Sequence, residues 1–180
     1  MKGYKIVADW HTHTRYSDGR GTVEDNVRAA SEKGLDEIAI TDHGPRGIFI
    51  GVKDQDVYQD IKNDIDTIKG QYPVRVLLGA EANVIDLDGS IDISPEISKE
   101  MDILLVGLHP QVMAANLGKT LGWVLPNQLG RFNKFLRRRM RNDNTKAIVN
   151  AMYNQPVNVV THPDLMMAVD LNEVARASAN

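Results

Sequence analysis

Short runs of aliphatic and β-branched residues alternate with longer amphipathic stretches along this chain. The apolar runs cover residues 5–8, 37–40, 74–78, 102–106 and 157–160. Each run has the length of a buried β-strand and is bounded by polar or turn-forming residues. Strands that alternate with helices predict right-handed βαβ units and a parallel sheet, either open or closed into a barrel. The pattern therefore predicts an α/β fold.

The stretches between these runs carry signals for helix ends. Thr22 is predicted to cap a first helix, in which Val23, Val27 and Ala30 recur at helical spacing before a stop at Gly34. A second helix is predicted over about residues 55–69 because its apolar residues form one stripe. The stripe and its terminating glycine are Val57, Ile61, Ile65, Ile68 and Gly70.

Further helix starts are predicted nearer the C-terminus. Ser94 is followed by Pro95, a capping side chain before proline at the first helical position. Residues 171–179 are predicted to form the last helix.

The stretch between His109 and His162 is longer than one helical crossover needs. Two helices are predicted there, near 129–140 and 145–154, the second capped by Asn144. We expect a helical insertion around residues 113–154 that lies over the strand ends, within a single domain covering residues 1–180.

Composition narrows the class of protein. The chain has 180 residues and a net charge of −3, so no overall charge attracts it to nucleic acid or an anionic membrane. It has no cysteine, which excludes disulfides and thiolate metal sites. The N-terminus shows no apolar signal-peptide region, and no apolar run approaches the length of a membrane span. We expect a soluble, cytoplasmic protein without a membrane partner.

All five histidines follow one of the predicted strands. They are His11, His13, His43, His109 and His162. The carboxyl ends of parallel strands lie along one edge of a sheet, so these imidazoles are expected in one crevice. Neutral imidazole is the commonest metal ligand in proteins. The pattern therefore indicates a site for more than one metal ion.

Each candidate ligand has a plainer structural interpretation when it is taken singly. A lone His-x-His pair is a weak signal, Asp18 fits an ordinary turn, and His43 fits a hydrogen-bonded structural histidine. His109 and His162 precede proline, which favours extended backbone at a strand end. Glu81 also follows a strand, and a carboxylate there can bridge two metals. The joint placement of all these residues is what favours a metal site.

In their order along the chain, these residues resemble the motifs of the PHP (polymerase and histidinol phosphatase) family of metal-dependent phosphoesterases. The matching segments are residues 11–19, 41–44, 79–83, 107–109 and 161–163. The resemblance extends from Asp9 to about Ala179, and the segments 41–44 and 79–83 look most similar to the bacterial YcdX-like branch.

The resemblance implies a distorted seven-stranded (β/α) barrel with up to three ions of zinc, manganese or iron. The implied ligands are His11, His13 and bridging Glu81 for the first ion, Glu81, His109 and His162 for the second, and Asp18 and His43 for the third.

The sequence departs from the family pattern at its end. Family members usually carry an Asp-x-His motif at the last strand, whereas this sequence stops at Asn180 after about five strands. We therefore expect a C-terminally incomplete PHP barrel, which is either a truncated form or one whose open edge a second copy of the chain covers.

The implied reaction is hydrolysis of a phosphoester by a metal-activated water. Glu81 would be the catalytic residue, the bridging carboxylate that positions the hydroxide. Three carboxylates could orient the histidines, or could serve only in turns and caps. They are Asp9, Asp42 and Asp164. Arg20 and Arg46 could bind a substrate phosphate.

These features favour an enzyme, a metal-dependent phosphoric ester hydrolase acting on a small phosphomonoester. A non-catalytic metal-binding protein, or a phosphodiesterase or nuclease, is the alternative. The arginine-rich run 137–141 could contact a phosphodiester, but few aromatics accompany it, so a solvated helix face or part of the insertion is favoured. For Trp123, core packing is favoured.

Overall fold

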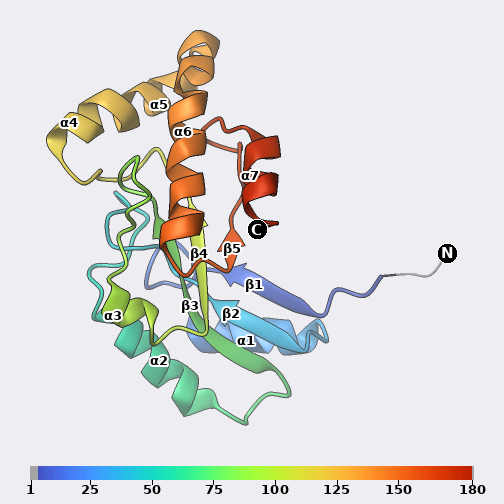
Figure 1. Ribbon diagram of the computed structural model, residues 1–180. Helices are drawn as coiled ribbons and strands as arrows, with labels where there is room; N and C mark the ends of the chain where they lie inside the picture. The colour runs from blue at the N-terminus through green and yellow to red at the C-terminus, as the bar shows by residue number, and fades with distance from the viewer. Residues whose placement is uncertain (1–3, 180) are drawn as a thin grey trace.

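The computed structural model describes residues 4–179, and its five strands form a single sheet (Figure 1). The strands are β1 (Ala8–Thr12), β2 (Glu37–Ile40), β3 (Arg75–Asn83), β4 (Ile103–Gly107) and β5 (Val159–Val160). They pair in sequence order, and every neighbouring pair is parallel. The sheet curls into half a barrel, and all the carboxyl ends lie on one side. The expected α/β fold with an incomplete barrel is confirmed.

The first strand begins later than the hydrophobic pattern predicts. Its ladder with β2 starts at the pair Ala8 and Glu37, and the register shifts between Asp9 and Thr12. The prediction of a strand over residues 5–8 was therefore wrong in position, because the strand starts only at the last of these residues, Ala8, and continues to Thr12. As a result His11 lies inside β1 rather than after it.

Two helices, α1 (Val23–Glu32) and α2 (Val57–Ile68), follow the first two strands as predicted. Thr22 and Asp25 form a reciprocal capping box at the start of α1. Gly34 and Gly70 have φ of 68° and 79°, the left-handed conformation in which glycine readily ends a helix. The short helix α3 (Pro95–Ser98) begins at the predicted cap, Ser94.

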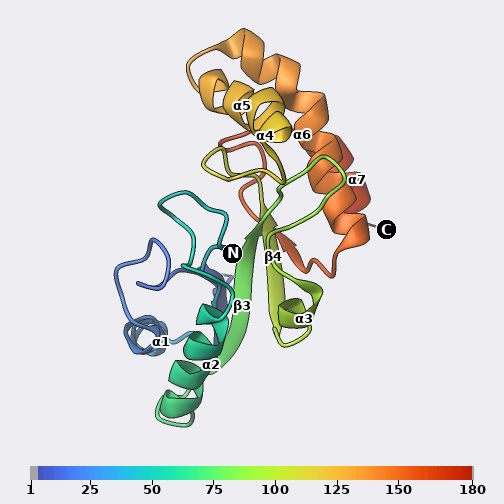
Figure 2. The ribbon, with the colours of Figure 1, turned by 90° about the vertical axis from the view of Figure 1, so that its left-hand side faces the viewer.

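The segment between β4 and β5 is helical, but its helices differ from the predicted pair. They are α4 (Leu117–Lys119), the π-helical turn η1 (Thr120–Val124), α5 (Leu125–Gly130) and α6 (Lys134–Asn154). α6 is one continuous helix of 21 residues. These helices lie beyond the carboxyl ends of the strands, with α6 descending beside β4 (Figures 1 and 2).

Asn144 explains why the predicted helix break is absent. Its side chain does not cap a helix; it is fully buried and accepts hydrogen bonds from Trp123 Nε1 at 2.8 Å and Asn127 Nδ2 at 2.9 Å. Its amide nitrogen donates to Ala168 O at 3.0 Å. The polar side chain thus holds η1 and α5 against α6. The expected core packing of Trp123, which is 2% exposed, is confirmed.

Two of the arginines in the run 137–141 join α6 to the segment after β5. Arg137 donates to Asp164 O at 2.7 Å, and Arg141 lies 2.7 Å from the carboxylate of Asp170. Asp170 caps the last helix, α7 (Leu171–Ala177), which starts where the sequence predicts. No helix in the described part of the chain is long and apolar enough to cross a membrane.

The two faces of the sheet bury different side chains. Leu78, Ala80 and Ala82 of β3 belong to the core on the face covered by α1 and α2. Successive side chains of a strand point to opposite faces, so Leu77, Glu81 and Asn83 share the other face. On that second face Leu77 packs near the base of the sheet, and Glu81 lies toward the carboxyl edge. A buried carboxylate therefore stands above a small apolar layer.

Candidate metal centre

Glu81 is fully buried, and three imidazoles face one of its two oxygens. Oε2 lies 3.0 Å from His43 Nδ1, 3.2 Å from His11 Nε2 and 3.4 Å from His13 Nε2. The rings arrive from β1 and from the segments that follow β1 and β2. The N-terminal part of the chain thus supplies one side of the site.

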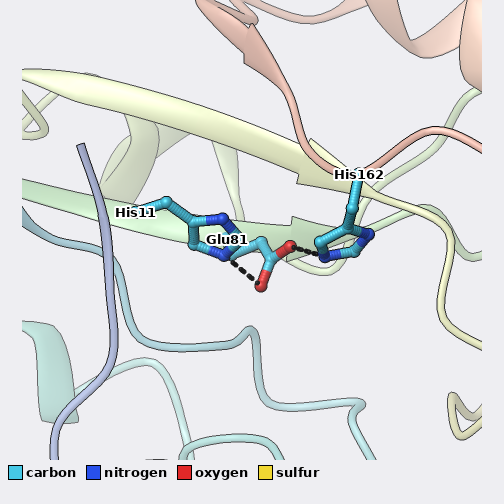
Figure 3. Close-up of side chains that lie close together, drawn as sticks. All are labelled: His11, Glu81 and His162. Atoms are coloured by element: carbon cyan, nitrogen blue, oxygen red, sulfur yellow. Dashed lines mark ion pairs between the residues drawn. The ribbon is translucent and has the colours of Figure 1, made fainter. Parts of the chain in front are cut away.

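The other oxygen of Glu81 faces the C-terminal part of the chain. Oε1 lies 2.9 Å from His162 Nε2 and 3.4 Å from His109 Nε2. It also accepts a 2.6 Å hydrogen bond from the Thr161 hydroxyl. Figure 3 shows the carboxylate between His11 and His162, with one oxygen directed at each ring.

The five rings form a closed circuit around this carboxylate. Each imidazole is adjacent to two others. Ring centroids are separated by 4.9 Å for His11 and His13, 4.4 Å for His13 and His43, 4.8 Å for His43 and His109, 5.2 Å for His109 and His162, and 5.6 Å for His162 and His11. The expectation that all five imidazoles meet in one crevice is therefore met in the structure.

Many of the polar atoms in this circuit are buried yet form no hydrogen bond within residues 4–179. They are His11 Nε2, His13 Nδ1, His43 Nδ1, His109 Nε2 and Glu81 Oε2. Buried polar atoms without partners are costly, and such a concentration is rare in proteins. Neutral imidazoles and a carboxylate are the donor set that divalent transition metals prefer. The residues present thus fit a metal centre.

Among the described residues, two groups of three have ligand atoms within 4.8 Å of one another. One contains His11, Glu81 and His162, and the other His13, His43 and Glu81. This grouping differs from the one that the resemblance implies, in which His11 and His13 share an ion. The assignment of residues to individual ions stays a prediction.

Gly107 has no side chain, and the space that a side chain would fill is taken by residues of the site. A Cβ at this position would lie 2.6 Å from His109 Cε1, 2.7 Å from Thr161 Oγ1 and 3.0 Å from Glu81 Oε1. Real Cβ atoms essentially never approach other atoms to 2.6 Å. Glycine at the end of β4 is therefore a condition for the approach of His109 and Glu81.

Asp18 lies at the outer side of the circuit. Its oxygens are 3.7 Å from His13 Nδ1 and 3.9 Å from His43 Nε2, and its side chain is 42% exposed. The loop that carries it is held by the buried Asp42. This carboxylate accepts 2.8 Å hydrogen bonds from the backbone and hydroxyl of Thr14 and a 2.6 Å bond from Ser17. Asp42 therefore shapes the loop and makes no described hydrogen bond to a histidine ring.

The other two carboxylates expected to orient histidines also bind elsewhere. Asp9 Oδ1 accepts from the backbone N–H of His11 at 3.3 Å. Asp164 Oδ1 accepts from Val169 N at 3.1 Å and lies 3.3 Å from Arg137. Neither carboxylate has a described hydrogen bond or ion pair with an imidazole ring, and any role in orienting histidines stays a prediction.

The two arginines expected to bind phosphate differ in their surroundings. Arg46 donates to the carbonyl oxygens of Ala114 at 2.8 Å and Met113 at 3.4 Å, so its guanidinium joins two loops. Arg20 is exposed, in the loop that also carries Asp18. Arg20 is thus the freer of the two for a ligand.

His162 departs from the backbone geometry expected before proline. Its φ is 27°, in the left-handed region, although extended backbone was expected. Asp164, two residues later, also has a positive φ, of 68°. The chain turns sharply at the end of β5, and this turn brings His162 Nε2 to Glu81. Non-glycine residues in this region carry strain that the surrounding contacts must offset.

Three residues that hold the circuit, two of them in direct contact with it, were not predicted from the sequence as site residues. Asn83 Oδ1 lies 2.7 Å from His109 Nδ1, Asp92 binds Asn83, and Thr161 binds Glu81. Asn83 could have been identified because it lies two positions after Glu81 and so shares its face of β3. Asp92 lies in the connection after β3, where the sequence carries no such signal.

The pKa values of the histidines diverge because their surroundings differ. The interaction with Glu81 raises the pKa of His11, against the effect of burial. Burial lowers the pKa of His13 to about 4, and the neighbouring His43 lowers it further. Burial also lowers the pKa of His109. Burial would raise the pKa of Glu81, but the surrounding imidazoles outweigh it and hold that pKa below its usual range. At neutral pH, Glu81 is thus ionised and His13 and His109 are neutral.

Comparison with known proteins agrees with this geometry. The PHP domain family model matches residues 9–162. A protein named probable phosphatase from Thermoanaerobacter sp. (strain X514) is 31% identical over 177 residues, covering 97% of this chain and 61% of its own length. A protein of the same name from Caldanaerobacter subterraneus is 32% identical, and the match covers 99% of this chain and 61% of the relative. Another, from Proteus mirabilis, is also 32% identical, and the match covers 95% of this chain and 59% of the relative.

The chain thus spans about three fifths of the length of the curated relatives that it matches. The family model covers both halves of the imidazole circuit, from β1 to His162. The chain belongs to the PHP domain family.

Proposed function

We propose that this chain forms the metal-binding catalytic part of a phosphoesterase that hydrolyses a small phosphomonoester with a metal-activated water. The observation that carries the proposal is the circuit of five imidazoles around one buried carboxylate, whose ligand atoms include several without a hydrogen-bond partner among the described residues. The relatives are named probable phosphatases, which supports the same reaction class. Residues 1–180 would form one domain with a helical insertion around residues 113–154.

Glu81, Asp18 and the five histidines would hold the metal ions. Glu81 would present one oxygen to each half of the circuit and bridge two ions among His11, His13, His43, His109 and His162. Asp18 would reach a further ion from the outer side. Two or three ions of zinc, manganese or iron would supply Lewis-acid activation of water and stabilisation of the phosphoryl charge.

The protein groups would also determine protonation and substrate position. His13 and His109, whose pKa values are lowered, offer lone pairs at neutral pH without first losing a proton. Arg20 is exposed in the loop that carries Asp18 and is proposed to bind a phosphate oxygen. We assign Arg46 the weaker substrate role, because backbone carbonyls already occupy its guanidinium.

The proposal is tested by metal analysis together with a phosphatase assay. Purified protein is expected to contain zinc, manganese or iron and to hydrolyse p-nitrophenyl phosphate faster with added Mn²⁺. Both properties should be lost in Glu81→Ala and His109→Ala proteins purified in parallel, which excludes a contaminating phosphatase.

The alternatives give different results in the same experiment. Full metal occupancy without turnover of any phosphoester would identify a non-catalytic metal-binding protein. Cleavage of bis-p-nitrophenyl phosphate or single-stranded DNA in preference to the monoester would identify a phosphodiesterase. Metal-free protein that shows no turnover with any added ion would refute the proposal.

A further inference from the structure

His109 makes a hydrogen bond through Nδ1, the ring nitrogen that does not face Glu81. Its Nδ1 lies 2.7 Å from Oδ1 of Asn83, and both side chains are buried. An amide oxygen can only accept a hydrogen bond, so Nδ1 of His109 must carry the proton. The lone pair is then left on Nε2, the atom that faces Glu81 at 3.4 Å. The contact with Asn83 therefore selects the tautomer that can bind a metal.

Asp92 determines which way the amide of Asn83 points. Asp92 is 6% exposed, and its Oδ2 accepts a 2.6 Å hydrogen bond from Asn83 Nδ2. Its Oδ1 accepts from the backbone N–H of Asn83 at 2.7 Å. Because the carboxylate receives N–H groups on both oxygens, the amide nitrogen of Asn83 must face Asp92 and the amide oxygen must face His109.

The same pair of side chains also contacts the segment after His43. Asp92 Oδ2 accepts from the backbone N–H of Arg46 at 3.0 Å, and Asn83 Nδ2 lies 3.3 Å from the carbonyl oxygen of Gly44. A Cβ at Gly44 would overlap the carboxylate of Asp92, so this close approach requires glycine. The pair thus joins the segment carrying His43 to the segment carrying His109.

We propose that Asn83 and Asp92 are positioning residues. They fix the tautomer and orientation of His109, and they hold the segment that follows His43 in place, both from the side away from Glu81. The metal-affinity part of this inference rests on the proposed function, whereas the tautomer part can be measured in metal-free protein. Outer partners of this kind typically contribute about 10–100-fold to metal affinity.

The test uses histidine ¹⁵N NMR spectra of the chelator-treated protein, with the His109 signals assigned from a His109→Gln spectrum. In the unaltered protein, His109 is expected as the Nδ1–H tautomer. In Asn83→Ala it should become a mixture of tautomers, and the affinity for Zn²⁺ should fall about 10–100-fold. Asp92→Asn places an amide against three N–H donors, so it should shift the same signals. It is the second variant if Asn83→Ala does not fold.

Asn144→Ala is the matched control, because Asn144 is equally buried and hydrogen-bonded but belongs to the α5–α6 packing. It should lower stability and leave the His109 tautomer unchanged. An Nε2–H tautomer in the unaltered protein would overturn the inference. So would an unchanged tautomer with Zn²⁺ affinity within about twofold in both site variants. A Nδ1–H tautomer that depends on Asn83, in protein that binds no metal, would uphold the positioning role and refute the proposed function.

Gly44→Ala provides an independent route to the same conclusion. The added methyl group must displace the Asp92 carboxylate without altering any hydrogen-bonding side chain. It is expected to change the His109 signals in the same direction as Asp92→Asn. A folded Gly44→Ala protein with an unaltered His109 spectrum would contradict the coupling between the two segments.

Discussion

The hydroxyl of Thr161 donates a 2.6 Å hydrogen bond to Oε1 of Glu81, and both residues are buried. This bond holds the carboxylate in one rotation, with Oε2 left for His11, His13 and His43. Thr161→Val keeps the shape and removes the donor, so we expect the affinity for Zn²⁺ to fall about tenfold. A competition titration against a chelating dye measures this. Thr161→Ser, which keeps the hydroxyl, should bind like the unaltered protein, and equal affinity in the valine variant would contradict the role.

Glu81→Gln should abolish metal retention with little change in volume. The amide carries no charge, and its NH₂ group would face imidazole nitrogens where a cation is expected. We expect metal content after gel filtration to fall to a small fraction of the unaltered value, measured by elemental analysis. Circular dichroism checks that the variant is folded. Full metal content in folded Glu81→Gln would show that the carboxylate is not a ligand.

Gly107→Ala should damage the site through sterics alone. Its Cβ would press on His109, Thr161 and Glu81 at once, and overpacking of this kind costs about 1–3 kcal/mol. We expect lower stability by urea denaturation and weaker Zn²⁺ binding. Gly122→Ala is the matched control: a Cβ there meets no neighbour within 4 Å, and alanine favours the helix by about 1 kcal/mol. Similar losses in both variants would argue against the steric account.

Metal binding should release a proton from His11. The pKa of His11 is raised above 6.5 by Glu81, so part of the metal-free protein carries a charged imidazole near neutral pH. A ligand must be neutral, so affinity should rise with pH through this pKa and then level off. Calorimetry near pH 6.5 in two buffers of different ionisation heat measures the release. If the binding heat of His11→Gln no longer depends on the buffer, His11 is confirmed as the source of the proton. Equal binding heats of the unaltered protein in the two buffers would contradict proton release.

The stability of the metal-free protein should fall with acidity because of His13. Its pKa is about 4 in the folded state and about 6.5 when unfolded, so the unfolded chain takes up the proton first as pH falls. The contribution of His13 to the free energy of unfolding is therefore complete above pH 6.5 and is lost toward pH 4. The loss is on the order of 1–3 kcal/mol. His11 acts with the opposite sign because its pKa is raised. Urea denaturation of chelated protein at several pH values should show a weaker dependence in His13→Gln.

Local signals predicted the framework of this fold well. The caps at Thr22 and Ser94 and the stops at Gly34 and Gly70 act within one helical turn, so neighbouring residues are enough to identify them. The convergence of the histidines also followed from a local rule, because parallel strands end on the same side.

The errors arose where distant contacts decide the local structure. Asparagine often caps helices, which is why Asn144 was predicted to start one. Its hydrogen bonds to Trp123, Asn127 and Ala168 instead make it a buried residue inside α6. His162 takes a left-handed backbone that its own sequence does not favour. The function of Asp92 depends on a contact with Asn83, which no spacing rule reveals.

The sequential strand order has a consequence for synthesis on the ribosome. His11, His13, His43 and Glu81 all lie within the first three strands, whereas His109 and His162 belong to segments made later. Domains generally fold as units, and the N-terminal segments of a chain leave the ribosome first. All the residues of the Oε2 half of the circuit are therefore made before those of the Oε1 half. Glu81, the last of the early residues to be made, must wait for His109 and His162 before its Oε1 has imidazole neighbours.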